Sequence, residues 1–190
     1  MSEGIHIPED TTPHDPNKPK TWKDKIPTFI AITTLILAVC ATSTSFKAAG
    51  YGYRMVLAQN QASDQWSYYQ AKSIKQTTYQ VQRDALDITR AQNPQQAAQI
   101  DKQIAAYDKE IARYKQEQKE IMEEAKRLER DRDKAQNINS LFGQGLIFME
   151  VGILLASLAA INKNNFFWYL GSGVGVIGIG MFFYTLSQTF

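Results

Sequence analysis

The chain has 190 residues, of which 44% are hydrophobic and 21% are charged, and its formal net charge is +2. A charge so close to zero argues against a nucleic-acid-binding protein. The single cysteine, Cys40, leaves no disulfide framework within the chain and no pair of thiols for a metal. The apolar residues gather in three blocks, so the sequence does not predict one ordinary globular core.

Residues 1–25 are predicted to form a polar, proline-rich tail without apolar periodicity. His6 and His14 lie eight residues apart with carboxylates nearby, which is the pattern of a weak metal site. We favour the alternative, a polar tail that holds no metal. Four lysines beside Trp22 are typical of a cytoplasmic interfacial anchor; they are Lys18, Lys20, Lys23 and Lys25.

Three blocks are predicted to be transmembrane helices, namely residues 26–46, 141–161 and 166–187. About 20 apolar residues with a rise of 1.5 Å each match a hydrocarbon layer of about 30 Å. The first block follows a long polar segment and exceeds the apolar core of a signal peptide, so we expect it to be retained as an anchor. The short link between the second and third blocks predicts a tight helical hairpin.

The hydrophilic segment between the first two blocks, residues 47–138, is predicted to be a helical stalk. It is rich in Ala, Gln, Lys and Arg, which favour helix. Asn93-Pro94 is its one strong helix breaker, which predicts a turn at residues 93–95. The two arms match in length and each reaches roughly 65–70 Å. A chain that turns once and returns over the same distance forms an antiparallel hairpin.

The returning arm carries apolar residues at alternating steps of three and four, which is typical of a coiled coil. Ten of the twelve positions are apolar, and Gln118 and Arg132 are the two exceptions. The twelve are Ala97, Ile100, Ile104, Tyr107, Ile111, Tyr114, Gln118, Ile121, Ala125, Leu128, Arg132 and Ala135. The predicted fold is therefore an all-α membrane protein with three transmembrane helices and a long antiparallel coiled-coil hairpin between the first and second.

The outgoing arm contains an amide-rich and aromatic stretch, residues 58–76. A stripe at three- to five-residue spacing is predicted to face the returning arm near residues 121–128; it comprises Ala58, Ala62, Trp66, Tyr69 and Ile74. We favour a polar contact between helices here. The alternative is a ligand-binding strip built from Gln61, Asp64, Trp66, Tyr69 and Lys72. Because no histidine-based triad and no paired carboxylates occur, we expect no catalytic residue, no cofactor and no enzyme.

This stretch also carries a resemblance. The sequence LAQNQASDQWSYYQAKSIKQ, which follows the first apolar block directly, resembles a family of uncharacterised bacterial membrane proteins known as a domain of unknown function. The resemblance covers the anchor, the stalk and the terminal pair of spans, and leaves out residues 1–25. It implies a bacterial inner-membrane location and a three-span layout, and it brings no activity or cofactor.

Two features of the apolar blocks are candidate functional elements. Glu150 lies at the centre of the second block, where a carboxylate costs at least about 2.5 kcal/mol, so it should have a partner. The predicted partners are Thr33, Thr34, Ser43, Ser172 and Tyr184. The third block is rich in glycines suited to close helix packing, both within the chain and between copies. These are Gly171, Gly173, Gly175, Gly178 and Gly180, with Gly143, Gly145 and Gly152 as the facing surface.

The sequence therefore predicts a non-enzymatic membrane protein that forms a homo-oligomer and acts as a scaffold or partner-binding stalk. The alternatives are an oligomeric ion or proton channel that uses Glu150, and a ligand sensor that uses residues 58–76. Basic residues before the first block favour a cytoplasmic N-terminus and a periplasmic stalk, whereas those before the second block favour the reverse. We give precedence to the first helix. The expected partners are the lipid bilayer, further copies of the chain and a protein bound through the stalk, without nucleic acid.

Overall fold

The computed structural model describes residues 22–189, and within them the chain is almost entirely helical. The order of elements is α1 (Trp22–Gln92), the 3-10 turn η1 (Pro94–Gln96), α2 (Ala97–Asn162) and α3 (Asn165–Ser187). The all-α prediction is confirmed. The predicted tail lies outside the described residues as far as residue 21.

Three helices are long and apolar enough to cross a membrane, as predicted. α1 is a single helix of 71 residues, so the first apolar block continues into the outgoing arm without interruption. Gly50 and Gly52 do not break it, and Pro27 lies in its second turn, where it removes one backbone hydrogen bond without ending the helix. The apolar block and the outgoing arm therefore form one continuous helix.

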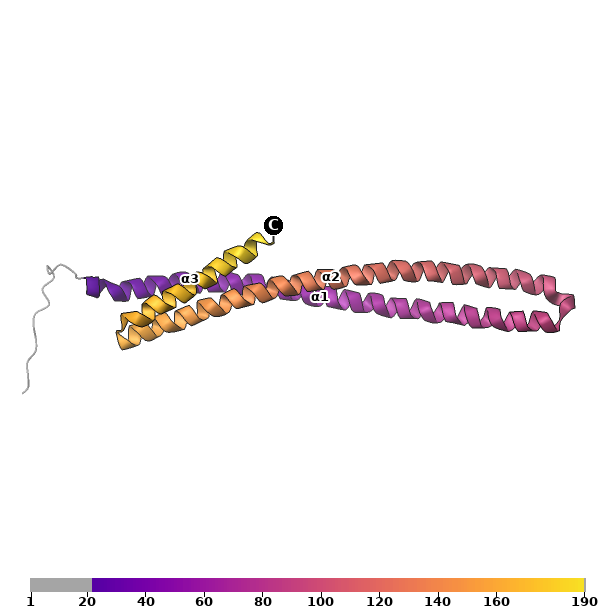
Figure 1. The fold of residues 1–190 in the computed structure, drawn as a ribbon, viewed down its shortest axis with the longest axis horizontal. Helices are drawn as coiled ribbons and strands as arrows, with labels where there is room; N and C mark the ends of the chain where they lie inside the picture. Colours follow the sequence, from indigo (N-terminus) through magenta and orange to yellow (C-terminus); the bar gives the residue numbers. More distant parts are fainter. Residues whose placement is uncertain (1–21, 190) are drawn as a thin grey trace, which may run out of the picture.

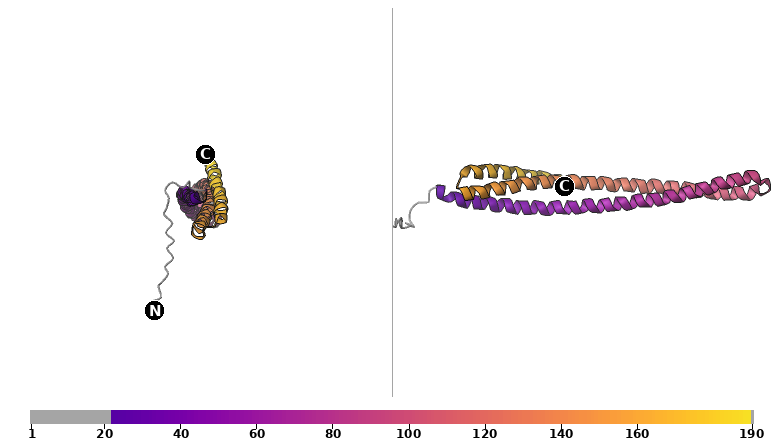
Figure 2. Two further views of the ribbon diagram at one scale, coloured as in Figure 1. Left: turned by 90° about the vertical axis from the view of Figure 1, so that its left-hand side faces the viewer. Right: turned by 90° about the horizontal axis from the view of Figure 1, so that it is seen from below.

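The chain reverses at η1, which begins with Pro94, and α2 returns beside α1 along the whole length of the molecule (Figures 1 and 2). The Asn93 amide donates to the Thr89 carbonyl oxygen at 3.1 Å, which closes the last turn of α1. Contacts between the two helices extend from Arg90 and Asp101 near the turn to Ile30 and Ala159 at the other end. The result is an elongated pair of helices.

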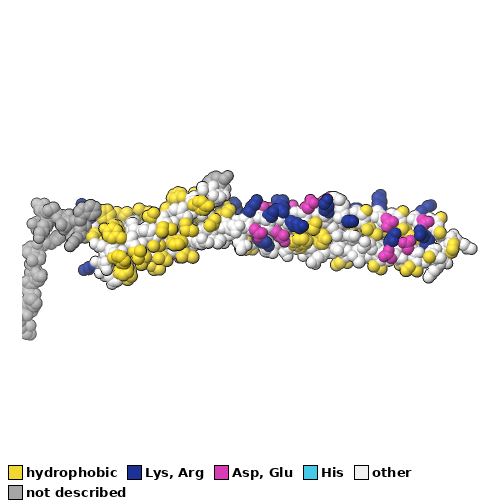
Figure 3. Space-filling view, in the orientation of Figure 1, with side chains coloured by type: hydrophobic (Ala, Val, Ile, Leu, Met, Phe, Trp, Pro, Cys, Tyr) yellow, Lys and Arg dark blue, Asp and Glu magenta, His cyan; other side chains and the backbone are white. Residues whose placement is uncertain are grey.

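The predicted seam of α2 faces α1. All twelve seam positions are buried or half-buried, including the two polar ones, Gln118 and Arg132. Gln118 donates a side-chain hydrogen bond to the Gln76 amide oxygen, and Arg132 donates to the Gln59 oxygen at 2.8 Å, so both polar groups are satisfied across the pair. On the face shown in Figure 3, the charged side chains gather on the half that contains the turn, whereas the other half is largely apolar.

α3 folds back obliquely over the apolar half of α1 and α2 (Figure 1). The reversal uses Lys163 in the left-handed conformation, with φ of 50°, and the Asn164 side chain then accepts a hydrogen bond from the Phe166 amide at 3.0 Å. Most contacts of α3 are with α2, but the Trp168 indole donates to Thr33 Oγ1 of α1 at 3.0 Å. Leu37 and Ala41 of α1 pack with Met149 of α2 beneath α3.

Candidate functional site

Glu150 is exposed on the outer surface of the apolar half, in a groove between α1 and α2. The groove widens there into an open hollow of about 480 Å³, to which α3 contributes no residue. Its lining consists of Ala41, Thr42, Ser45, Phe46, Ala49, Leu146 and Glu150. Within the described part of the chain, the carboxylate has no hydrogen-bond or ion-pair partner. A single chain therefore leaves this charge-bearing group uncovered.

The hydroxyl groups predicted as partners of Glu150 lie elsewhere. Thr33 receives the Trp168 hydrogen bond, and Thr34 and Ser43 donate to carbonyl oxygens of their own helix. Ser172 Oγ is buried without a hydrogen-bond partner among residues 22–189, and Tyr184 is exposed. Thr42 and Ser45 line the hollow instead. These two residues could not be identified by counting along one helix, because that count does not reveal the register between α1 and α2.

Small side chains predominate around the hollow, beside Phe46 and Leu146. A second open hollow between the same two helices lies toward Pro27, with Thr34 and Ala38 on the α1 side and Ser157 and Ala160 on the α2 side. The Thr42 and Ser157 hydroxyls donate to Ala38 and Ile153 carbonyl oxygens within their helices, both at 2.9 Å. Small side chains with satisfied hydroxyls let another helix backbone approach closely. The groove can therefore accept a helix that would cover Glu150.

Two of the five residues of the predicted strip, Trp66 and Lys72, contact α2, and a third, Tyr69, packs against Trp66. The Trp66 indole donates to Glu129 Oε1 at 2.9 Å, and Tyr69 packs edge-on against Trp66 with ring centroids 5.7 Å apart. Lys72 Nζ lies 2.6 Å from Glu117 Oε2. The partner Glu129 directly follows the predicted region, residues 121–128. These side chains thus join the two arms of the stalk.

The other two residues of the strip face outward, and so does Ile74. Gln61 and Asp64 are exposed and have no polar partner within residues 22–189. Ile74 is 68% exposed, so its predicted place in the inner stripe is wrong. The inner positions continue from Tyr69 to Lys72 and Gln76, which turns Ile74 to the opposite face of α1.

The partners Glu117 and Glu129 were not identified from the sequence, although the turn gives a usable signal. Lys72 lies 22 residues before Pro94 and Glu117 lies 23 residues after it. In an antiparallel pair, residues at equal distances from the turn lie at the same height. Counting outward from the predicted turn would have placed Glu117 opposite Lys72.

The Lys72–Glu117 contact also carries two cation–ring interactions. Lys72 Nζ lies 5.1 Å from the ring centroid of Tyr68 and 5.4 Å from that of Tyr114. The hydrogen bond from Lys72 lowers the pKa of the Glu117 carboxyl, and the hydrogen bond to Glu117 raises the pKa of the Lys72 ammonium. Each group therefore favours the charged state of the other.

The glycines of α3 fall into two sets. Gly171, Gly175 and Gly178 are buried against α2 and α1. A Cβ on Gly171 would lie 2.8 Å from the Gly152 carbonyl oxygen, and one on Gly178 would lie 2.8 Å from that of Gly145. By contrast, a Cβ on Gly173 or Gly180 would meet nothing within 4 Å, and the same holds for Gly143 of α2. The first set brings helix backbones together within the chain.

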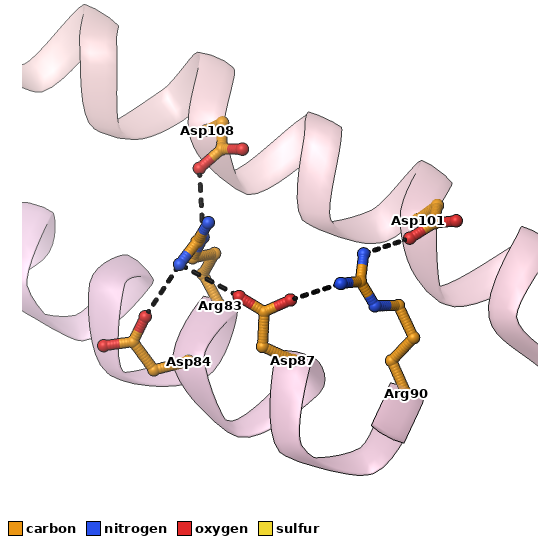
Figure 4. Close-up of polar contacts among 6 residues, drawn as sticks. All are labelled: Arg83, Asp84, Asp87, Arg90, Asp101 and Asp108. Atoms are coloured by element: carbon orange, nitrogen blue, oxygen red, sulfur yellow. Dashed lines mark hydrogen bonds and ion pairs between the residues drawn. The ribbon is translucent and has the colours of Figure 1, made fainter. Parts of the chain in front are cut away.

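A cluster of six charged residues ties the two arms together near the turn (Figure 4). Arg83 of α1 contacts Asp84, Asp87 and, across the pair, Asp108 at 3.3 Å. Arg90 likewise bridges Asp87 and Asp101, the latter at 2.8 Å. The hydrogen bond to Asp84 raises the pKa of Arg83, and the bond to Asp101 raises that of Arg90. Two of these contacts, Arg83–Asp108 and Arg90–Asp101, cross from α1 to α2.

No group of His, Cys, Asp and Glu suited to a metal ion occurs within residues 22–189. The family described as a domain of unknown function, DUF4337, has a sequence model that matches residues 27–188.

The chain belongs to this family. The match extends over both arms, the turn and all three apolar segments, so the predicted membership of an uncharacterised family is confirmed. Neither a curated protein nor a solved structure matches the chain. The function must therefore be argued from the geometry of the DUF4337 fold.

Proposed function

We propose that this protein is an integral membrane protein that self-assembles and holds a rigid coiled-coil stalk as a scaffold for a protein partner. The role is structural rather than catalytic. The apolar segments of α1, α2 and α3 cross the bilayer, and the long pair of α1 and α2 projects from it with Pro94 at the tip. The proposed location is the bacterial inner membrane, with the N-terminus in the cytoplasm and the stalk in the periplasm.

The coiled coil is supported by the burial pattern on both arms. On α1, positions spaced by seven residues from Ile30 to Leu86 are all buried or half-buried. A straight α-helix would drift by about 20° per heptad against such a repeat, so the pattern supports helices that wind around each other. The facing residues on α2 obey the same rule from Ile100 to Ala156. The winding thus continues from the stalk into the apolar half.

The main support for self-assembly is that the carboxylate of Glu150 is exposed. A glutamate near the middle of a spanning helix costs about 2.5–3.5 kcal/mol if lipid surrounds it, and it normally faces protein or water. The three helices of one chain do not cover it. A second copy seated in the groove gives the carboxyl group hydrogen-bond partners and excludes lipid. Gly173 and Gly180 provide an open small-residue face for such a contact.

The test compares the number of copies per particle in wild-type protein and in two variants, by mass photometry in lipid nanodiscs. Glu150→Gln keeps a group that donates and accepts hydrogen bonds, and we expect it to remain oligomeric. Glu150→Leu removes that group, and we expect a shift toward single copies. Ser157→Ala is the matched control, because its hydroxyl bonds within its own helix and it lies one heptad further along the same face. A wild-type particle with one copy would contradict the proposal.

A second function is favoured by the position of the hollow. Because Glu150 lies on the outer surface with Thr42 and Ser45, several copies that meet at this groove bring their carboxylates together around a shared polar region. Such an arrangement suits a proton or cation path. Proteoliposomes that hold wild-type protein would then conduct protons, and Glu150→Gln would abolish the flux. Equal proton flux in wild type and Glu150→Gln would show that the carboxylate is not part of a conduction path. Absence of flux in wild type would exclude the channel function and favour the scaffold function.

A further inference from the structure

The outer face of α1 carries an apolar stripe with a strict spacing of seven residues. Seven of the nine positions from Ile32 to Ile88 hold large hydrophobic or aromatic side chains, and these are exposed by between 48% and 82%. They are Ile32, Val39, Phe46, Tyr53, Ile74, Val81 and Ile88. The remaining two positions are Asn60 and Ser67. We call these nine residues the outer stripe.

The outer stripe points away from α2 from Ile32 to Ile88, apart from Phe46, which also lines the hollow beside Glu150. It has the same spacing as the buried positions from Ile30 to Leu86, so the winding that keeps those positions inside keeps the stripe outside. In the stalk, Ile74 and Val81 lie in a shallow groove with Thr77 and Thr78. In a single chain these apolar side chains are exposed to water, which is unfavourable in free energy, and burial against another helix would remove that exposure.

We infer that the outer stripe is the interface through which the α1 helices of two copies pack side by side, parallel and in register. This inference rests on the proposed self-assembly and names its contact surface. Phe46 belongs both to the stripe and to the lining of the Glu150 hollow. The same second copy can therefore contact the outer stripe and cover Glu150.

The length and charge of the stripe identify a second copy as the occupant. The stripe extends for roughly 85 Å, and a strip about 10 Å wide gives about 850 Å² per copy, close to the roughly 800 Å² that each partner buries in a stable complex. A partner must match that whole length, and a second copy anchored in the same membrane presents the same residues at the same heights. No stripe position is charged, so a copy meets no like charge across the interface.

The two polar positions of the stripe fit the in-register arrangement. In parallel copies at the same height, Asn60 faces Asn60 and Ser67 faces Ser67. An asparagine pair of this kind satisfies its own hydrogen bonds and penalises a shifted register, because a shift would place an amide against apolar side chains. The apolar residues supply affinity, and Asn60 fixes the alignment.

The experiment is disulfide cross-linking of full-length protein in nanodiscs, in a Cys40→Ala background. Val81→Cys and Ile74→Cys place thiols on the outer stripe, whereas Lys109→Cys places one on the exposed outer face of α2 at a similar height. A disulfide needs two Cα atoms within about 7 Å, so we expect dimer yields at 81 and 74 roughly ten times that at 109. Equal yields at the three positions would overturn the inference.

A charge placed on the stripe provides the second readout. Val81→Lys should abolish cross-linking through Ile74→Cys, while Gln116→Lys on the outer face of α2 should leave it intact. Both residues are exposed, so helicity by circular dichroism should match wild type. Wild-type particles with several copies that do not cross-link at 74 or 81 would overturn this inference alone. Single-copy wild-type particles would overturn the proposed function as well.

Discussion

Lys72 Nζ lies 2.6 Å from Glu117 Oε2, and this ion pair joins the outgoing and returning arms midway along the stalk. The two side chains are partly shielded, with 16% and 31% of their surface exposed. Tyr114 lies against the ammonium from the α2 side and is itself buried. The pair is therefore a cross-helix contact that reports directly on whether the arms are closed.

The stability of the stalk should depend on the ionisation of this pair. The folded pKa of Glu117 is lowered, so its contribution is fully present above the ordinary glutamate pKa of about 4.3 and is lost as the pH falls through the lowered value. The folded pKa of Lys72 is raised, so its contribution is present below about pH 10.4 and is lost as the pH rises through the raised value. Thermal melting followed by circular dichroism should show Glu117→Gln melting below wild type at neutral pH, with the difference vanishing in acid.

Glu123→Gln is the control for that measurement. It removes the same charge from an exposed position of α2 without a partner among the described residues. Its melting temperature should stay near that of wild type at neutral pH. If both variants lowered it equally, the effect would come from net charge rather than from the contact with Lys72.

Close packing of α3 on α2 should tolerate no added methyl group at the buried glycines. Gly178→Ala places a Cβ 2.8 Å from the Gly145 carbonyl oxygen and from Met149 Cγ, and we expect a loss of about 1–3 kcal/mol in unfolding free energy. Gly180→Ala meets open space and should not reduce the stability of the single chain. Denaturant titration of both variants in detergent measures the difference. Equal stabilities would contradict the packing described for Gly178.

The charged cluster at the tip should hold the ends of the arms together. Arg90→Met removes the contact with Asp101, and we expect faster amide hydrogen exchange from residue 83 to residue 108, since the helix ends next to Pro94 are then free to separate. Arg113→Met is the control, because Arg113 forms its ion pairs with Glu110 and Glu117 of its own helix. High salt should reduce the difference between wild type and Arg90→Met. Exchange at the tip that is unchanged in Arg90→Met would show that the cluster does not close it.

The helices, the turn and the seam of α2 could be predicted because each depends on local sequence. Apolar length defines the three long segments, and Pro94 is the one breaker between the arms. The side of α1 on which Ile74 lies could not be predicted in this way. α1 carries apolar residues on two opposite faces, and a spacing of three to five residues does not separate them. The burial of Tyr69 and Gln76, one heptad apart, assigns Ile74 to the outer face.

The direction of Glu150 could not be predicted for a related reason. Its neighbours at helical spacing are apolar on every side, so the sequence of α2 gives no polar face to assign. The packing of Gly152 on Gly171 determines which side of α2 is covered by α3, and Glu150 lies on another. That contact depends on the fold of the last two helices together.

The most direct test of the central claim is the mass of the wild-type protein in nanodiscs of native lipid. We predict particles that contain two or more copies of the 21.5 kDa chain, with the groove at Glu150 covered by protein. Particles that contain one chain, with Glu150 open to lipid, would contradict it.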